Sequence, residues 1–333
     1  MPTDLRLQQL TDWVQSERPH ANLQVASADA SFRRYFRVTE GSNSWIAMDA
    51  PPEKETLEPF IDITERLIQA SVNAPKIYQQ SLEQGFLLLG DLGDTPYLSA
   101  LNDKQADALY GDAFKALLQI QTADTSNLPV YDEALLQQEM NLMPEWFLSK
   151  HLGLSLSNQE QSDLQSVFEL LIKTALDQPQ VFVHRDYHSR NLMVTTSKNP
   201  GVIDYQDAVL GPVCYDLVSL LRDCYIAWPV QQVRQWVTEY RVLSQQQGII
   251  PEVDDELFQQ WFDWMGLQRH IKVLGIFARL NHRDGKAHYL NDLPLTLSYV
   301  MNVAANYPEM KPLVDIFQKY DIPKSIGTVE ISQ

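Results

Sequence analysis

The stretch from Val181 to Asp207 concentrates side chains that can donate, accept or hold charge. After three apolar residues come two histidines, two arginines, an aspartate and an asparagine within eight positions: His184, Arg185, Asp186, His188, Arg190 and Asn191. Two short apolar runs, 192–194 and 202–203, then flank a Ser/Asn/Pro turn and end on Asp204. Short apolar runs around such a turn predict a β-hairpin.

The predicted hairpin brings polar residues from its two ends together. Because a hairpin folds back on itself, we expect Asn191, before its first strand, to lie beside Asp204, after its second. Asp186 stands one loop away. Two carboxylates and an amide oxygen are hard ligands that suit Mg²⁺ carrying substrate phosphates. The alternative is a polar loop that joins two core strands by coincidence.

The spacing of these residues resembles the catalytic loop of protein kinases, H-R-D-x-x-x-x-N followed by D-F-G. The matching residues are His184-Arg185-Asp186, Asn191 and Ile203-Asp204-Tyr205. The continuation through Gly211-Pro212 to Tyr215-Asp216-Leu217 is instead similar to the aminoglycoside phosphotransferase family, small-molecule kinases that share the kinase fold. Within that family the chain most resembles bacterial cell-wall sugar kinases, which phosphorylate the anomeric hydroxyl of N-acetylmuramate and N-acetylglucosamine.

This resemblance implies a role for each residue of the motif. Asp186 would accept the proton of the attacking hydroxyl and orient it toward the γ-phosphate of ATP. Asn191 and Asp204 would hold Mg²⁺ against the triphosphate oxygens. His184 and Asp216 would support the loop, Asp216 by accepting its backbone amides. The implied cofactors are therefore ATP and Mg²⁺.

The implied fold is α+β and bilobal, with a small antiparallel-sheet N-terminal lobe and a larger, mainly helical C-terminal lobe. We expect residues 1–90 to bind nucleotide and 91–333 to carry catalysis and the acceptor. Periodicity predicts strands near 22–26, 32–38, 45–48, 76–80 and 86–89. It predicts helices near 4–17, 56–70, 103–122, 131–151, 157–177, 213–227, 229–247 and 254–281. The last residues, 322–333, are expected to form a loosely held tail.

The nucleotide side departs from the kinase pattern at one position. Kinases place a lysine on the third strand to grip the phosphates, whereas this chain has Met48 there. Arg33 and Arg34 are the predicted substitutes, since neighbouring residues of a strand face opposite ways and arginine clamps phosphate with two donors. Small residues up to Ser31 would let backbone amides approach phosphate, although a plain hairpin would look the same. Leu89 and Asp91 resemble the hinge that binds adenine.

The stretch 268–288 reverses the charge of the chain locally. It holds five basic residues and three of the seven histidines against one acid. Such a region suits an acceptor that bears a carboxylate, although its basic side chains could equally pair with an acidic surface. The acceptor-binding candidates are Arg279, His282 and Arg283, together with Arg190 beside the catalytic motif.

Composition limits the possible partners. The 333 residues carry a formal charge of −17, which argues against nucleic acid or anionic membranes as partners because phosphate surfaces attract basic faces. No apolar run approaches the ~18 residues of a membrane span. The two cysteines, Cys214 and Cys224, form no C-x-x-C motif, which fits a reducing compartment. We therefore expect a cytoplasmic protein whose partners are ATP and a small sugar.

Other functions remain open at this stage. The acceptor could be an aminoglycoside, homoserine or choline, and Met48 leaves room for a nucleotide-binding pseudokinase. A transition-metal site at His184, Asp186 and His188 would lack further ligands at the usual spacing. A serine hydrolase is disfavoured because the chain contains no G-x-S-x-G.

Overall fold

The computed structural model describes residues 4–28 and 32–332, which form two compact units. The first unit comprises residues 1–119 with 190–207, and the second comprises 120–189 with 208–333. The α+β class predicted from the sequence is confirmed. In the part of the chain described, no helix is both long and apolar enough to cross a membrane. The functional boundary predicted at residue 90 stays a prediction.

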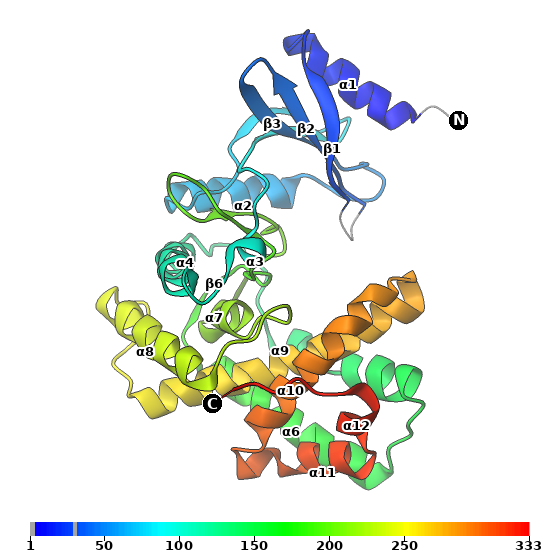
Figure 1. Ribbon diagram of the computed structural model, residues 1–333, viewed down its shortest axis with the longest axis vertical. Coiled ribbons are helices and arrows are strands. Elements are labelled where there is room, and N and C mark those ends of the chain that lie inside the picture. The colour runs from blue at the N-terminus through cyan, green and yellow to red at the C-terminus, as the bar shows by residue number, and fades with distance from the viewer. Residues whose placement is uncertain (1–3, 29–31, 333) are drawn as a thin grey trace. The chain divides into compact units, whose positions relative to one another are not determined.

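The first unit contains a five-stranded antiparallel sheet in the order β1-β2-β3-β5-β4. Its strands are β1 (Asn22–Ala28), β2 (Arg34–Glu40), β3 (Asn43–Asp49), β4 (Ile77–Ser81) and β5 (Phe86–Gly90). The unit also holds α1 (Leu5–Glu17), α2 (Glu58–Gln69), α3 (Tyr97–Ala100), most of α4 (Ala106–Gln121), and the short strands β7 (Leu192–Met193) and β8 (Gly201–Val202) (Figure 1). All five predicted sheet strands are present.

Alternation along the sheet strands sends apolar residues toward α1. Leu10 and Val14 of that helix are fully buried against Phe36, Val38 and Leu88 of the sheet. The opposite-facing residues of the same strands are thereby turned to the other side of the sheet. The turn before β5 requires glycine, since Gly85 has φ 73° and a Cβ there would lie 1.9 Å from the Ala50 carbonyl oxygen.

The second unit is mainly helical and is built around one long central helix, α9. It contains α5 (Glu133–Met140), the π-helix η1 (Met143–His151), α6 (Asn158–Asp177), α7 (Cys214–Leu221), α8 (Val230–Gln246) and α9 (Asp255–Asp284). Near the C-terminus follow η2 (Ala287–Asp292), α10 (Leu293–Ala304), η3 (Pro308–Met310), α11 (Lys311–Lys319) and α12 (Ile322–Ile326). A two-stranded sheet pairs β6 (Gln180–Val183) with β9 (Val209–Pro212). Helix α9 contacts η1, α10, α7 and α6.

Three predictions of local structure differ from what is observed. The helix predicted at 131–151 is divided into α5 and η1, because Pro144 in the first turn of η1 has no amide hydrogen with which to extend α5. Helix α7 ends at Leu221, and Asp223 then accepts from the backbone of Ser189 instead of continuing the helix. The C-terminal tail is held in place, since Val329 and Ser332 hydrogen-bond Ser298 and Val230.

Candidate active site

The hairpin predicted after the catalytic motif is present in the first unit. Strands β7 and β8 pair antiparallel through Leu192 with Val202 and Met193 with Gly201. The Asn191 carbonyl accepts from the Ile203 amide at 3.1 Å, which extends the pairing by one step. Asn191 and Asp204 consequently meet, with 3.2 Å between Asn191 Nδ2 and Asp204 Oδ2.

Asp204 is fixed by its neighbours in an uncommon backbone conformation. Its φ is 65°, a region that residues other than glycine rarely occupy. Gln206 Nε2 donates to Asp204 Oδ1 at 2.9 Å. On the next residue, the Tyr205 hydroxyl lies 2.8 Å from the hydroxyl of Thr64 on α2, and its ring packs on Phe60. Strain of this kind persists where surrounding contacts determine it, and it is common at functional sites.

Asn191 and Asp204 line a cavity of about 520 Å³ within the first unit. The sheet supplies one wall through Tyr35, Ile46 and Leu89, and the segment 90–94 after β5 supplies another. A cavity of this size with mainly apolar walls and a few polar groups is typical of a small-molecule site. The predicted hinge residues Leu89 and Asp91, and also Arg190, are among the lining residues.

An arginine that the sequence reasoning missed fixes the hinge segment. Arg37 Nε donates to Asp91 Oδ2 at 2.8 Å, and its Nη2 donates to the Gly93 carbonyl at 2.8 Å. Asp91 in turn accepts from the Gly93 amide at 2.9 Å. Arg37 lines the cavity beside Tyr35, two positions away on the same face of β2. The alternation used to select Arg33 and Arg34, continued along the strand, would have found it.

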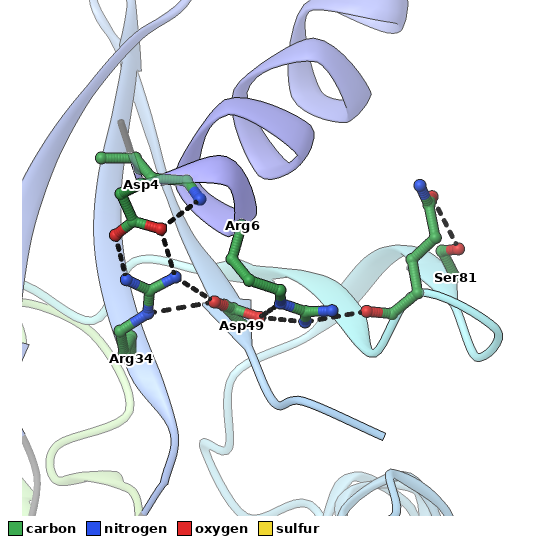
Figure 2. Close-up of polar contacts among 7 residues, drawn as sticks. Asp4, Arg6, Arg34, Asp49 and Ser81 are labelled. Atoms are coloured by element: carbon green, nitrogen blue, oxygen red, sulfur yellow. Dashed lines mark hydrogen bonds and ion pairs between the residues drawn. The ribbon is translucent and has the colours of Figure 1, made fainter. Parts of the chain in front are cut away.

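The predicted phosphate-binding arginines are engaged elsewhere in the first unit. Arg34 Nε and Nη2 donate to the fully buried Asp49 at 3.0 and 2.6 Å, and the same guanidinium pairs with Asp4 at the start of α1 (Figure 2). Arg33 forms an ion pair with Glu55 at 2.5 Å. Neither arginine is among the residues that line the cavity. Ser31 lies outside the described residues.

The motif predicted to be catalytic begins in the second unit, at the end of β6. Asp216, at the start of α7, accepts the His184 amide at 2.7 Å and the Arg185 amide at 2.9 Å. His184 is fully buried, and its Nδ1 accepts from the Asp186 amide at 3.2 Å. Arg185 has φ 76°, which turns the chain sharply before Asp186. The backbone around Asp186 is therefore determined by side chains of the same unit.

The pKa values of two aspartates near this turn shift in opposite directions. Burial raises the pKa of Asp216 to about 7, against the two amides that favour its charged form. Burial would also raise the pKa of Asp186, but the electrostatic influence of His188, Lys272, His184 and Arg269 outweighs it and holds that pKa below its usual value. Asp186 is therefore ionised at neutral pH and able to accept a proton.

The basic stretch 268–288 is divided between buried and exposed positions. Arg269 and Lys272 are buried in α9, where Lys272 Nζ lies 2.9 Å from Glu139 Oε1. Arg279 is half-buried, and its Nε has no hydrogen-bond partner in the described structure. His282 Nε2 lies 3.3 Å from His151 Nδ1, and Arg283 pairs with Asp284. Burial and the charge of Arg283 lower the pKa of Arg279.

The donor set at the hairpin fits a magnesium ion. Mg²⁺ is usually held by one or two carboxylates or amides, and waters and substrate phosphates complete its octahedron. Asn191 and Asp204 bring one amide and one carboxylate to the same point of the cavity wall. A site of this kind needs no dense cluster of protein ligands, and among the described residues no group of three or more His, Cys, Asp or Glu side chains is arranged to hold a metal.

The chain is similar to known proteins along most of its length. Residues 22–264 match the model of the phosphotransferase enzyme family. An N-acetylmuramate/N-acetylglucosamine kinase of Pseudomonas putida is 46% identical over 94% of this chain and 96% of its own length. A kinase of the same name from Pseudomonas aeruginosa is 44% identical over 95% and 97%. A choline kinase structure from Streptococcus pneumoniae has a TM-score of 0.63 at 12% identity over 90% of this chain and 99% of that one. The chain belongs to the phosphotransferase enzyme family.

Proposed function

We propose that this protein transfers the γ-phosphate of ATP to the anomeric hydroxyl of an amino sugar, N-acetylmuramate or N-acetylglucosamine. The observation that carries the proposal is the Asn191–Asp204 pair on the wall of a 520 Å³ cavity. Its oxygens suit the metal that accompanies a nucleotide, and two relatives that match more than nine-tenths of the chain are named as kinases of these two sugars.

The chain's own residues would divide the work of phosphoryl transfer. Leu89 and the backbone of 90–93 hold the base of the nucleotide, and Arg37 keeps that segment in place through Asp91. Asn191 and Asp204 hold Mg²⁺, which neutralises charge on the phosphates. Asp186 accepts the hydroxyl proton as the sugar oxygen bonds to the γ-phosphorus and the bond to ADP breaks. Arg33, Arg34 and Arg190 remain candidates for phosphate or acceptor binding.

The test is product analysis with both sugars. We expect ADP release with N-acetylmuramate and N-acetylglucosamine, and a sugar 1-phosphate in the phosphorus NMR spectrum. Asp186→Asn should lower kcat by about 10²- to 10⁴-fold, the usual contribution of a general base, with an unchanged unfolding temperature. Strict preference for an aminoglycoside, choline or homoserine in the same assay would contradict the acceptor. Stabilisation by ATP and Mg²⁺ without transfer to any acceptor would identify a pseudokinase.

We further propose that Arg279 binds the carboxylate that distinguishes N-acetylmuramate from N-acetylglucosamine. Of the three basic candidates on α9, His282 already contacts His151 and Arg283 already pairs with Asp284. Arg279 is partly desolvated, and its Nε has no hydrogen-bond partner among the described residues. A guanidinium in this state gains most from a bidentate carboxylate.

The two sugars provide an internal control for Arg279. Arg279→Gln should lower kcat/KM for N-acetylmuramate by about tenfold or more, as expected for a lost charged hydrogen bond, and leave that for N-acetylglucosamine unchanged. Arg234→Gln, at an exposed position of α8, serves as the matched variant and should alter neither. Equal losses for both sugars would show that Arg279 does not read the carboxylate.

A further inference from the structure

Glu139 of α5 is a buried carboxylate that gathers three donors in the second unit. Its side chain is 8% exposed. It accepts from the Tyr131 hydroxyl, from the Arg185 guanidinium and from Lys272 Nζ, the last at 2.9 Å. Burial alone would raise the pKa of Glu139, but Lys272 and Arg185 lower it, so the group is an anion. A buried anion of this kind is retained only where its partners are well placed.

The two cationic partners of Glu139 both act on the catalytic aspartate. Arg185 immediately precedes Asp186, and its guanidinium lies over the Tyr131 ring, 5.6 Å from the centroid. Lys272, on α9, also donates to the Tyr215 hydroxyl at 2.9 Å. Its charge is among the influences that hold Asp186 ionised. Glu139 therefore connects Arg185, the residue before Asp186, with α9, the helix whose Lys272 acts on Asp186.

If either of the same two cations paired with Asp186, it would weaken that carboxylate as a general base. A buried lysine or arginine that loses its carboxylate partner is strongly destabilised, and Asp186 is a carboxylate that interacts electrostatically with both cations. An aspartate held in such an ion pair is a weak base and cannot turn toward a hydroxyl. Glu139 offers both cations a competing carboxylate, and Tyr131 and Tyr215 fix the direction of their side chains.

We propose that Glu139 is a positioning residue for Asp186: by holding Arg185 and Lys272, it prevents either cation from closing onto the catalytic carboxylate. This inference rests on the proposed role of Asp186 in phosphoryl transfer. A different, merely structural role would be to fill and neutralise the interior between α5 and α9. The two roles differ in what happens when Lys272 is removed together with the carboxylate.

The experiment is a double-mutant cycle on kcat with N-acetylmuramate as acceptor. Glu139→Gln alone should lower kcat by about tenfold or more, the effect expected of a coupled neighbour, without changing KM for ATP. In the Lys272→Met background the same substitution should lower kcat by about threefold or less, because the ammonium is absent and the released Arg185 guanidinium still lies over the Tyr131 ring. Equal tenfold losses in both backgrounds would overturn the proposal.

A second buried glutamate provides the matched control. Glu160 of α6 has a side-chain exposure of 11%, and its partners Ser157, Lys319 and Tyr320 lie outside the catalytic motif. Glu160→Gln should lower the unfolding temperature and leave kcat unchanged.

Two comparisons keep the outcome decisive. If Glu139→Gln alone does not fold, the pair Lys272→Met and Glu139→Gln/Lys272→Met still decides, since neither leaves an ammonium beside an absent carboxylate. If wild type is inactive toward both sugars, the proposed function fails instead. An active wild type with an inactive Asp186→Asn variant and an unimpaired Glu139→Gln variant would reject only this inference.

Discussion

Asp204 and Arg185 occupy backbone conformations that favour glycine, with φ values of 65° and 76°. Each is fixed by hydrogen bonds within its own unit: Gln206 bonds the Asp204 carboxylate, and Asp216 accepts the Arg185 amide. The strain has a use at both positions, because it directs one residue of the motif toward the cavity wall and turns the chain just before Asp186. Hydrogen bonds at these two residues therefore stabilise a positive φ that the backbone preferences of aspartate and arginine disfavour.

A buried histidine makes stability depend on pH. His270 of α9 is fully buried, stacks on Tyr299 and donates from Nε2 to the Arg222 carbonyl at 2.9 Å. Burial, reinforced by the charge of Arg269, lowers its pKa to about 3. The unfolded chain takes up this proton near pH 6.5 and the folded chain only near pH 3. The contribution of His270 to stability is therefore complete above pH 6.5 and is lost as the pH falls toward 3.

Chemical denaturation of His270→Gln between pH 7 and 4 checks this prediction. Wild type should lose up to about 1.4 kcal/mol more per pH unit than the variant below pH 6.5, the value for one proton. His20→Gln, at an exposed position, should follow the wild-type slope. Parallel curves for wild type and His270→Gln would mean that His270 takes up its proton equally in both states.

At the scale of elements, the sheet and α1 are joined by charge as well as by apolar packing. Asp49, at the end of β3, is fully buried and accepts from Arg34 of β2 and from Arg6 of α1 (Figure 2). Arg34 also pairs with Asp4, which caps α1 through the Leu7 amide. One aspartate thus ties the first helix to two strands of the sheet whose other face lines the cavity.

Removal of Asp49 should weaken the contact between α1 and the sheet. We expect Asp49→Ala to lower the free energy of unfolding by about 3 kcal/mol, as measured in urea, because two guanidinium groups lose a buried partner. Asp177→Asn, which breaks an exposed pair with Lys173 on α6, should cost less than about 1 kcal/mol. Similar values for the two variants would show that burial does not strengthen the Asp49 network.

At the scale of the whole molecule, a nucleotide bound in the cavity of the first unit would link ligand binding to folding. A nucleotide that binds only the folded chain stabilises it by about 2.7 kcal/mol at a concentration 100 times its Kd. If Asn191 and Asp204 hold the accompanying metal, part of this stabilisation must depend on Mg²⁺. The linkage can be measured without turnover, and it therefore tests metal binding separately from catalysis.

Thermal unfolding with ATP, with and without Mg²⁺, measures this linkage. Wild type should gain unfolding temperature from Mg²⁺ at saturating ATP, and Asp204→Asn should lose that gain and keep its stability without ligand. Asp103→Asn, an exposed carboxylate of the same unit, should behave as wild type. A full Mg²⁺-dependent gain in Asp204→Asn would place the metal on other residues.

Local sequence patterns predicted much of the secondary structure of this protein. Alternation and turn residues predicted all five sheet strands and the hairpin that joins Asn191 to Asp204, because both signals lie within a few residues of the chain. The motif spacing predicted the family. The predicted helix ends were less accurate. Pro144 divides one predicted helix, and another ends before Asp223, which accepts from the Ser189 amide.

Only the tertiary structure decided which charges meet. Arg34 could be named from the sequence, but its partners Asp4 and Asp49 lie on other elements, and so do the partners of Glu139. An ion pair depends on where two distant segments fold, and its strength depends on how much water is excluded there. The sequence therefore determined the fold and the spacing of the motif, and the packing of separate elements decided which arginines line the cavity and which charges surround Asp186.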